Sequence, residues 1–224
     1  MADSNRADGI PSEDPVWRVR RFFSDLNTKW LMMTYPFANK VDKLSIHHSC
    51  QISRRAAPRI HLGEYVQLHQ DVWLNIEAPL DVKGEPVLVL EDGVVIGRNS
   101  IISVKNGVHF ERDVITGPSV LIMDHNHAYE DVTRSIKVQG ITEGGRIRIG
   151  QGSWIGNGST IVCSQGELVL GEHCLVATNA VITRSFPAYC VISGNPARIV
   201  KQYDPAKGVW TLGSVRPTEN ELTR

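Results

Sequence analysis

The amino-acid sequence predicts a mainly β protein, a parallel β-solenoid built from hexapeptide repeats, and two observations support this fold class. The first is an aliphatic residue that returns at every sixth position in several long runs. Neither the helical period nor strand alternation gives this spacing, whereas short strands wound into triangular coils do. One hexapeptide then forms one wall, and about eighteen residues form one coil. The periodic positions are Leu62, Leu68, Leu74 and Leu80; Leu90, Ile96, Ile102 and Val108; Phe110, Thr116 and Ile122; Ile149, Ile155 and Ile161; and Leu170, Val176 and Ile182.

The second observation is the chemistry of the corner positions. Glycine often follows the aliphatic residue, as at Gly63, Gly97 and Gly156, and glycine tolerates the backbone angles of a tight corner. Four positions after the aliphatic residue the side chain is small or β-branched, as at Val94 and Ser159. Stacked coils superimpose equivalent positions, so the large residue fills the interior and the small one fits the corner. A β-sandwich, the alternative, would show alternation and irregular turn spacing.

Residues 1–45 are predicted to form an N-terminal tail and a helical segment. Residues 1–14 are polar and contain Gly and Pro, which indicates a mobile tail. Residues 15–35 look helical, because Pro15 follows Asp14 as a first-turn proline follows an N-cap. We expect this helix to pack across the open end of the solenoid, since terminal coils need cover; a membrane-surface or partner-binding helix is the alternative. Its expected apolar face comprises Trp17, Phe22, Phe23, Leu26, Trp30 and Met33.

The rest of the chain divides into a repeat domain and a short extension. The hexapeptide repeats cover residues 46–200, and residues 128–148 interrupt them as a protruding loop. Long loops on rigid scaffolds commonly carry binding residues. Residues 201–224 form a C-terminal extension, which is expected to fold back along the outside between Tyr203 and Trp210.

Charge and composition exclude some function classes. The chain has 24 basic and 24 acidic residues, so it offers no basic footprint for a nucleic acid. We see neither a secretory signal nor an apolar run long enough to cross a membrane, and we therefore expect a cytoplasmic protein. The four cysteines show no CxxC pairing, which indicates reduced structural thiols.

Two motifs carry a resemblance to a known family. Residues 149–156 (IGQGSWIG) resemble the IGxxxWIG segment of hexapeptide-repeat acyltransferases, and residues 193–198 (SGNPAR) resemble their closing GNPA(R/K) motif. Within that family the chain looks most like the sugar O-acetyltransferases, which include the maltose and galactoside enzymes and those that decorate bacterial surface polysaccharides. The resemblance implies a left-handed β-helix, a homotrimer, acetyl-CoA as co-substrate and a sugar acceptor.

The resemblance also points to a general base. In the sugar acetyltransferases a histidine at the exit from a coil acts as the base, just ahead of an extended loop. Residues 116–122 resemble the coil that precedes it, which makes His127 the first choice. Neutral imidazole titrates near the working pH, as removal of a hydroxyl proton requires. Asp124 or a backbone carbonyl is expected to hold the tautomer of His127. His125 is a reserve base, an acceptor-binding residue or a wall residue, and would share a face with His127 if the segment stayed extended.

Further site residues follow from position in the family pattern. The acyl-CoA arm and its phosphates lie along the C-terminal coils of the family, and Arg184, Arg198 and Lys201 suit a phosphorylated adenosine. Trp154 is expected to buttress the catalytic coil. The cofactor candidates are Trp154, Asn157, Thr178, Thr183, Arg184, Arg198 and Lys201, and the weaker acceptor candidates are Asn99, Ser103 and Asn106.

At two places the sequence departs from the family pattern, and there the family's site residues do not carry over directly to this chain. The step from Ile161 to Leu170 is longer than six residues, so residues 163–166 are expected to bulge near the CoA groove. The wall from Ile96 to Val108 is only loosely similar to the maltose and galactoside enzymes and lacks an obvious acidic partner. The acceptor is therefore not expected to be a free disaccharide.

The sequence thus favours an acetyl-CoA-dependent O-acetyltransferase acting on a carbohydrate hydroxyl in surface-polysaccharide or glycoconjugate synthesis. An N-acetyltransferase of an amino sugar or nucleotide sugar is the main alternative, since the same base and cofactor groove serve an amine. A γ-type carbonic anhydrase shares the scaffold, but it uses an HxxxxH pair plus a distant histidine where this chain has HxH, so no metal is expected. A non-enzymatic scaffold is the remaining alternative.

Overall fold

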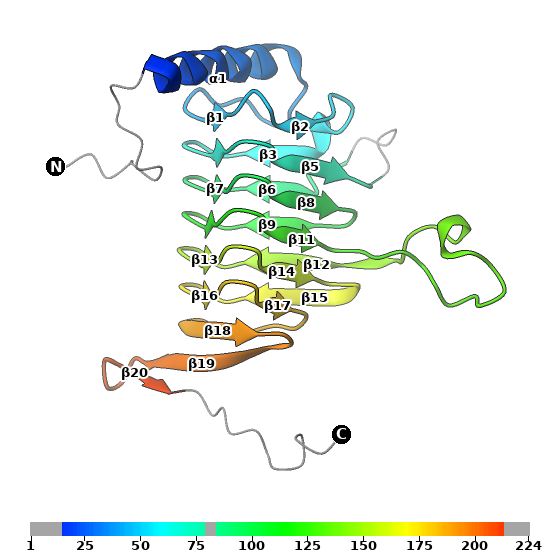
Figure 1. The fold of residues 1–224 in the computed structure, drawn as a ribbon, viewed down its shortest axis with the longest axis vertical. Helices are drawn as coiled ribbons and strands as arrows, with labels where there is room; N and C mark the ends of the chain where they lie inside the picture. Colours follow the sequence, from blue (N-terminus) through cyan, green and yellow to red (C-terminus); the bar gives the residue numbers. More distant parts are fainter. Residues whose placement is uncertain (1–14, 79–83, 213–224) are drawn as a thin grey trace.

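The computed structural model describes residues 15–78 and 84–212 and confirms the predicted parallel β-helix (Figure 1). The chain winds through stacked coils, with a helix across one end and an antiparallel hairpin at the other. Residues 1–14, Leu80 and the last twelve residues of the expected C-terminal extension, 213–224, lie outside the described residues.

Three walls form the described part of the solenoid, in sheets of nine, six and five strands. Wall A contains β1 (Ser45–Ile46), β4 (Gln67–Leu68), β7 (Val95–Ile96), β10 (Ile115–Thr116), β13 (Trp154–Ile155), β16 (Leu175–Val176), β18 (Cys190–Gly194), β19 (Ala197–Asp204) and β20 (Val209–Leu212). Wall B contains β2 (Gln51–Ile52), β5 (Trp73–Ile76), β8 (Ile101–Val104), β11 (Leu121–Met123), β14 (Thr160–Val162) and β17 (Val181–Ile182). Wall C contains β3 (Ile60–Leu62), β6 (Leu88–Leu90), β9 (Val108–Phe110), β12 (Gly144–Ile149) and β15 (Gln165–Leu170).

Coils in the middle of the solenoid are longer than the eighteen residues that the repeat predicts. Val95 and Ile115, which pair in consecutive coils of wall A, are twenty residues apart. The extra length lies in wall C, where each strand buries two residues, as Val108 and Phe110 do in β9. The six-residue spacing is broken by a step of two residues from Val108 to Phe110, and this step is the alternation of one ordinary strand.

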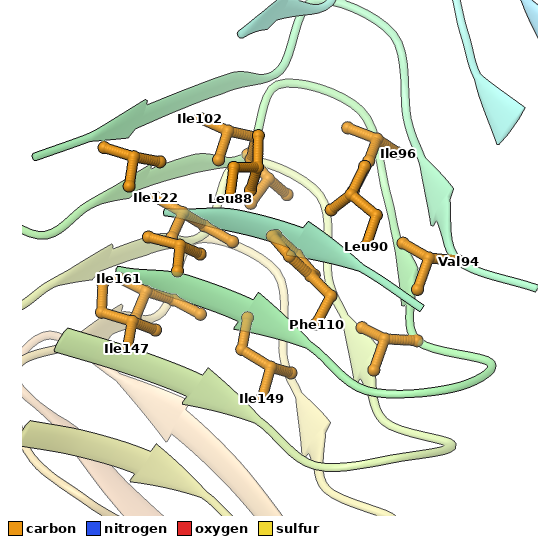
Figure 2. Packing of buried hydrophobic residues seen from close by; sticks show 14 of the residues in the cluster. Leu88, Leu90, Val94, Ile96, Ile102, Phe110, Ile122, Ile147, Ile149 and Ile161 are labelled. Carbon is orange, nitrogen blue, oxygen red and sulfur yellow. The ribbon is translucent and has the colours of Figure 1, made fainter. Parts of the chain in front are cut away.

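The core is a set of stacked aliphatic columns (Figure 2). In wall B, Ile102, Ile122 and Ile161 pair in consecutive coils, and each is fully buried. A buried aliphatic side chain of this size contributes roughly 1.5–3 kcal/mol through removal from water. The repeat therefore holds the walls rigid on either side of any loop that leaves them.

The helix α1 (Pro15–Thr34) lies across the first coil, as expected, but with the opposite face inward. Thr28 Oγ1 accepts from Ile46 N at 2.8 Å and donates to Ile46 O at 3.2 Å, and Leu31 is buried beside it. The first coil has no preceding coil to pair its backbone groups, so a polar side chain serves it better. The predicted apolar packing face is wrong: Phe22, Phe23, Leu26, Trp30 and Met33 are exposed, and the side chain of Trp17 is not described.

The far end of the solenoid is closed by an antiparallel turn. β19 pairs with β18 on one side and with β20 on the other. The rings of Tyr203 and Trp210, whose centroids are 5.5 Å apart, pack together on this hairpin. The chain thus folds back as expected between these two residues.

Two short 3-10 helices complete the described elements. One, Ala57–Arg59, precedes β3, and the other, Ile136–Val138, lies in the loop that protrudes between β11 and β12 (Figure 1). No helix within the described ranges has both the length and the apolar character needed to span a bilayer.

Candidate active site

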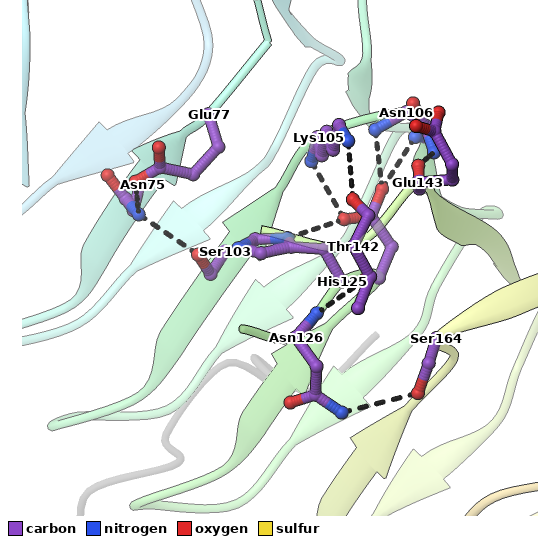
Figure 3. A network of polar contacts seen from close by, with 12 residues as sticks. Asn75, Glu77, Ser103, Lys105, Asn106, His125, Asn126, Thr142, Glu143 and Ser164 are labelled. Atoms are coloured by element: carbon purple, nitrogen blue, oxygen red, sulfur yellow. Dashed lines mark hydrogen bonds and ion pairs between the residues drawn. The ribbon is translucent and has the colours of Figure 1, made fainter. Parts of the chain in front are cut away.

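A buried carboxylate organises the point where the protruding loop leaves wall B. Asp124 follows β11 directly and is fully buried. Its Oδ2 accepts from the backbone N–H groups of Asn106 at 2.7 Å and Gly107 at 2.8 Å. Its Oδ1 accepts from Lys105 N at 2.7 Å and His125 Nδ1 at 2.9 Å (Figure 3). One side chain thus joins two neighbouring coils.

The surroundings of Asp124 favour its ionised form. Burial alone raises the pKa of the carboxyl, but the hydrogen bonds from His125 and from the three backbone N–H groups outweigh it and hold the pKa below its ordinary value. An ionised carboxylate only accepts hydrogen bonds, so Nδ1 of His125 is the donor in this contact. The hydrogen bond to Asp124 fixes the orientation of the His125 imidazole.

His127 has a different environment from His125. His125 is 5% exposed, whereas the side chain of His127 is exposed. The two were expected to share a face, but β11 ends at Met123 and the chain turns, so strand alternation no longer applies. Asp124 was expected to orient His127, and the structure gives this contact to His125 instead. His127 is held through its backbone, which pairs with Ile141 in an antiparallel bridge.

The two arms of the loop are clamped together at its root. Thr142 N donates to Asn126 O at 2.7 Å, and Asn126 N donates to Thr142 Oγ1 at 3.0 Å. Lys105 Nζ donates to Thr142 O. Asn126 Nδ2 also donates to Ser164 Oγ on the next coil, at 3.2 Å. This clamp fixes the position of the His127 backbone. No motif or spacing in the sequence pointed to Lys105 or Thr142.

Gly144 allows the returning arm to approach Asp124 closely. Its φ of +79° is a left-handed conformation, and a Cβ there would lie 2.8 Å from Asp124 O and 2.9 Å from Asn106 Nδ2. Only glycine accepts both conditions without strain. Beside it lies a groove of about 510 Å³, lined by Asn106, Glu143, Gly144, Gly145, Arg146, Gly166 and Glu167.

Two of the three acceptor candidates lie at this place. Asn106 lines the groove, and Ser103 lies on wall B where its Oγ accepts from Asn75 Nδ2 at 3.0 Å. Asn75 also donates to Glu77 Oε1 at 2.9 Å, so a neighbouring coil supplies the acidic group that the wall from 96 to 108 lacks. The sequence reasoning missed Asn75 and Glu77 because they lie one coil away. Asn99 lies elsewhere, at the corner between walls A and B, where its φ is +57°.

The cofactor candidates are spread over three places in one chain. Asn157 and Thr178 are exposed in consecutive coils at the corner between walls A and B, where Asn179 N donates to Asn157 O. Thr183 and Arg184 follow β17 at the corner between walls B and C, the same corner that carries Asp124. The remaining three lie on wall A: Trp154 on β13, and Arg198 and Lys201 on β19.

Residues 163–166 were expected to bulge outward, and residues 164–166 are exposed, but as part of a strand extension and not as a loop. Cys163 is buried, and the chain continues directly into β15, whose Gln165 and Gly166 pair with Gly144 and Gly145 of β12. The arm returning from the loop needs a hydrogen-bonding partner for its backbone, and the extra residues lengthen β15 to provide one. The insertion is therefore a strand extension beside the groove.

Metal-binding groups do not gather at this place. Among residues 15–78 and 84–212, no three His, Cys, Asp or Glu side chains lie close enough together to hold a metal ion.

Comparison with known proteins confirms the resemblance to acetyltransferases. The chain is 30% identical over 139 residues to a probable acetyltransferase of Mycobacterium tuberculosis, covering 62% of this chain and 45% of that protein. It is 29% identical over 137 residues to a putative lipopolysaccharide biosynthesis O-acetyltransferase of Escherichia coli, covering 58% of this chain and 68% of that protein. The chain thus spans less than half of the mycobacterial relative. No protein-family model matches the chain.

The fold is shared with a solved acyltransferase. An N-acyltransferase from Bacillus cereus, crystallised with dTDP and 3-hydroxybutyryl-CoA, superposes with a TM-score of 0.63 at 13% identity, covering 80% of this chain and 89% of that one. The fold class, a left-handed parallel β-helix of hexapeptide repeats, is thereby confirmed.

Proposed function

We propose that this protein is an acetyl-CoA-dependent O-acetyltransferase that acts on a carbohydrate hydroxyl in surface-polysaccharide or glycoconjugate synthesis. The observation that carries the proposal is an accessible histidine at the root of a clamped loop, next to a buried Asp–His pair and a polar groove. The similarity to acetyltransferases over the same repeats supports the reaction class. We place the reaction in the cytoplasm, where CoA thioesters are made.

His127 acts as the general base in this proposal. A base must meet an acceptor that arrives from solvent, and the exposed imidazole of His127 can do so, whereas His125 is buried with Nδ1 committed to Asp124. His127 takes the hydroxyl proton as the oxygen attacks the thioester carbonyl. The carbon–sulfur bond then breaks, and the protonated imidazole returns a proton to the leaving CoA thiolate. A backbone N–H donor is expected to stabilise the oxyanion.

A thiol-release assay with acetyl-CoA tests the reaction class. Sugars and nucleotide sugars are offered as pairs that differ only in a hydroxyl or an amine, and the O-transferase proposal expects release with the hydroxyl member. Release with the amine alone would make the protein an N-acetyltransferase. No release with any acceptor would favour a scaffold or the carbonic-anhydrase alternative, and hydration of carbon dioxide that a chelator abolishes would single out the second.

The basic residues of β19 are proposed to contact the phosphates of CoA. Arg198 and Lys201 are exposed on β19. Replacing either by alanine is expected to raise the KM for acetyl-CoA more than the KM for the acceptor. The effect should shrink at high salt because exposed charge-assisted contacts are screened. Steady-state kinetics measure it, with Lys207→Ala on the adjacent turn as the control. Equal effects on both substrates would contradict the proposal.

We propose a homotrimer with each site in a groove between two subunits. Within one chain the cofactor candidates lie on wall A and on two corners, and one flat wall cannot enclose a pantetheine arm on two sides. A second subunit alongside would supply the opposing wall, and cyclic assembly closes such contacts. Light scattering should give three times the chain mass of 24.9 kDa. A fully active monomer on dilution would contradict the shared site.

A further inference from the structure

The helix α1 exposes its apolar face. Val19, Phe23, Leu26, Trp30 and Met33 follow one another at alternating steps of four and three residues, which places them on one stripe of the helix. Phe22 widens the stripe. The six side chains are between 52% and 80% exposed. We call Val19, Phe22, Phe23, Leu26, Trp30 and Met33 the apolar stripe.

The stripe points away from the rest of the molecule. The opposite face of α1 carries Ser24, Thr28 and Leu31, which are buried, and Thr28 is bonded to the first coil. Because α1 lies across the end of the stack (Figure 1), most of the stripe faces outward, and Trp30 makes an edge contact with the ring of Tyr35. At about 1.5 Å per residue the helix is roughly 30 Å long, so a flat surface can meet its whole length at once.

Charge decides what kind of surface fits. Within α1 there are four basic residues and one acidic residue, Asp25. By helical position Arg18 and Lys29 border the stripe on one side, and both are exposed. A second copy packed on this stripe would place like charges alongside one another, with one acid per helix to offset them. An anionic surface complements them.

We propose that the apolar stripe of α1 lies in the surface of a membrane that contains anionic lipids. Aromatic and aliphatic side chains on one face and cations at its edge are the features of helices that lie in the interface. Trp30, Phe22 and Phe23 enter the boundary between headgroups and acyl chains, while Arg18 and Lys29 contact lipid phosphates. The helix lies on the bilayer and does not cross it, in keeping with the absence of a spanning helix among the described residues.

Vesicle co-sedimentation of the full chain tests this proposal, without acetyl-CoA or an acceptor, so its outcome is independent of the proposed enzyme activity. The probes are phosphatidylcholine vesicles with and without phosphatidylglycerol. Binding should require phosphatidylglycerol and weaken with salt. Leu26→Gln should lower the partition coefficient by roughly tenfold, because burial of one leucine is lost. Lys29→Glu should lower it by about as much, since one cation becomes an anion.

Matched substitutions at the opposite end of the solenoid provide the controls. Leu212 on β20 is 83% exposed, and Lys207 lies in the turn before it. Leu212→Gln and Lys207→Glu should leave vesicle binding unchanged. The proposal fails if the wild-type chain does not sediment with anionic vesicles, or if Leu26→Gln and Leu212→Gln act alike. It also fails if Leu26→Gln lowers the mass measured by light scattering, because the stripe would then join copies of this chain.

Discussion

Replacement of His127 by alanine should lower turnover by roughly two to four orders of magnitude, the usual effect of losing a general base. The side chain of His127 is exposed at the loop root, so its removal leaves the buried columns of the solenoid intact. The rate of CoA thiol release measures the effect, and light scattering checks that the assembly is unchanged. His48→Ala, an exposed histidine on the first coil, is the matched control and should keep full activity.

The comparison with His125 decides which histidine is the base. His125→Ala should reduce turnover less than His127→Ala, because His125 supports the loop root through Asp124 in our proposal. A folded His125→Ala protein with the greater loss would reverse the assignment. The Asp124–His125 pair would then be the catalytic unit, with Nε2 of His125 taking the proton.

Of the substitutions described, removal of the Asp124 carboxylate should lower the free energy of unfolding most. Asp124→Ala leaves three backbone N–H groups and His125 without their buried acceptor. Loss of one partner from such a buried charged network costs about 3–5 kcal/mol. Urea unfolding of the purified protein measures the change. Asp131→Asn should change stability little, because the side chain of Asp131 accepts from Thr133 within the same loop and an amide oxygen can still accept.

The ionisation of the Asp124 carboxyl should make stability depend on pH. Because the pKa of Asp124 is lower in the folded protein than in the unfolded chain, its contribution is complete above the unfolded value of about 4 and is lost as the pH falls through the folded value. Wild-type stability should therefore decline below about pH 4. The Asp124→Asn protein should show a shallower decline. Parallel curves for the two proteins would contradict this account.

The fold could be predicted because the repeat is local. Each hexapeptide encodes one inward aliphatic and one small corner residue, and stacking repeats that pattern in every coil, as at Ile102, Ile122 and Ile161. Pro15 likewise marked the start of the N-terminal helix. The orientation of that helix depends on the backbone of Ile46, which has no preceding coil to pair with and bonds Thr28 instead. Amphipathicity in the sequence does not reveal such a tertiary contact.

The candidate site could be predicted only in part. The histidine-rich segment before the loop was visible in the sequence, but its partners come from other coils. Asp124 bonds residues 105–107, and Asn75 meets Ser103 from a neighbouring coil. The choice of His125 as the partner of Asp124 depends on the turn after Met123, which no spacing rule gives. The extension of β15 was hidden because its partner strand is the returning arm of the loop.

The clamp between Asn126 and Thr142 separates the loop from the coils, so that the two parts can change sequence independently. On the side of the solenoid, the coils keep their register whatever the loop contains, since β12 and β15 pair along their full length. Beyond it, the loop can lengthen at little entropic cost, because closure entropy grows slowly with the number of residues. Exchange of residues 128–140 for a loop of different sequence should therefore preserve folding and alter acceptor choice. The solenoid is in this sense a constant scaffold, and the loop is a segment that can be replaced without changing the fold.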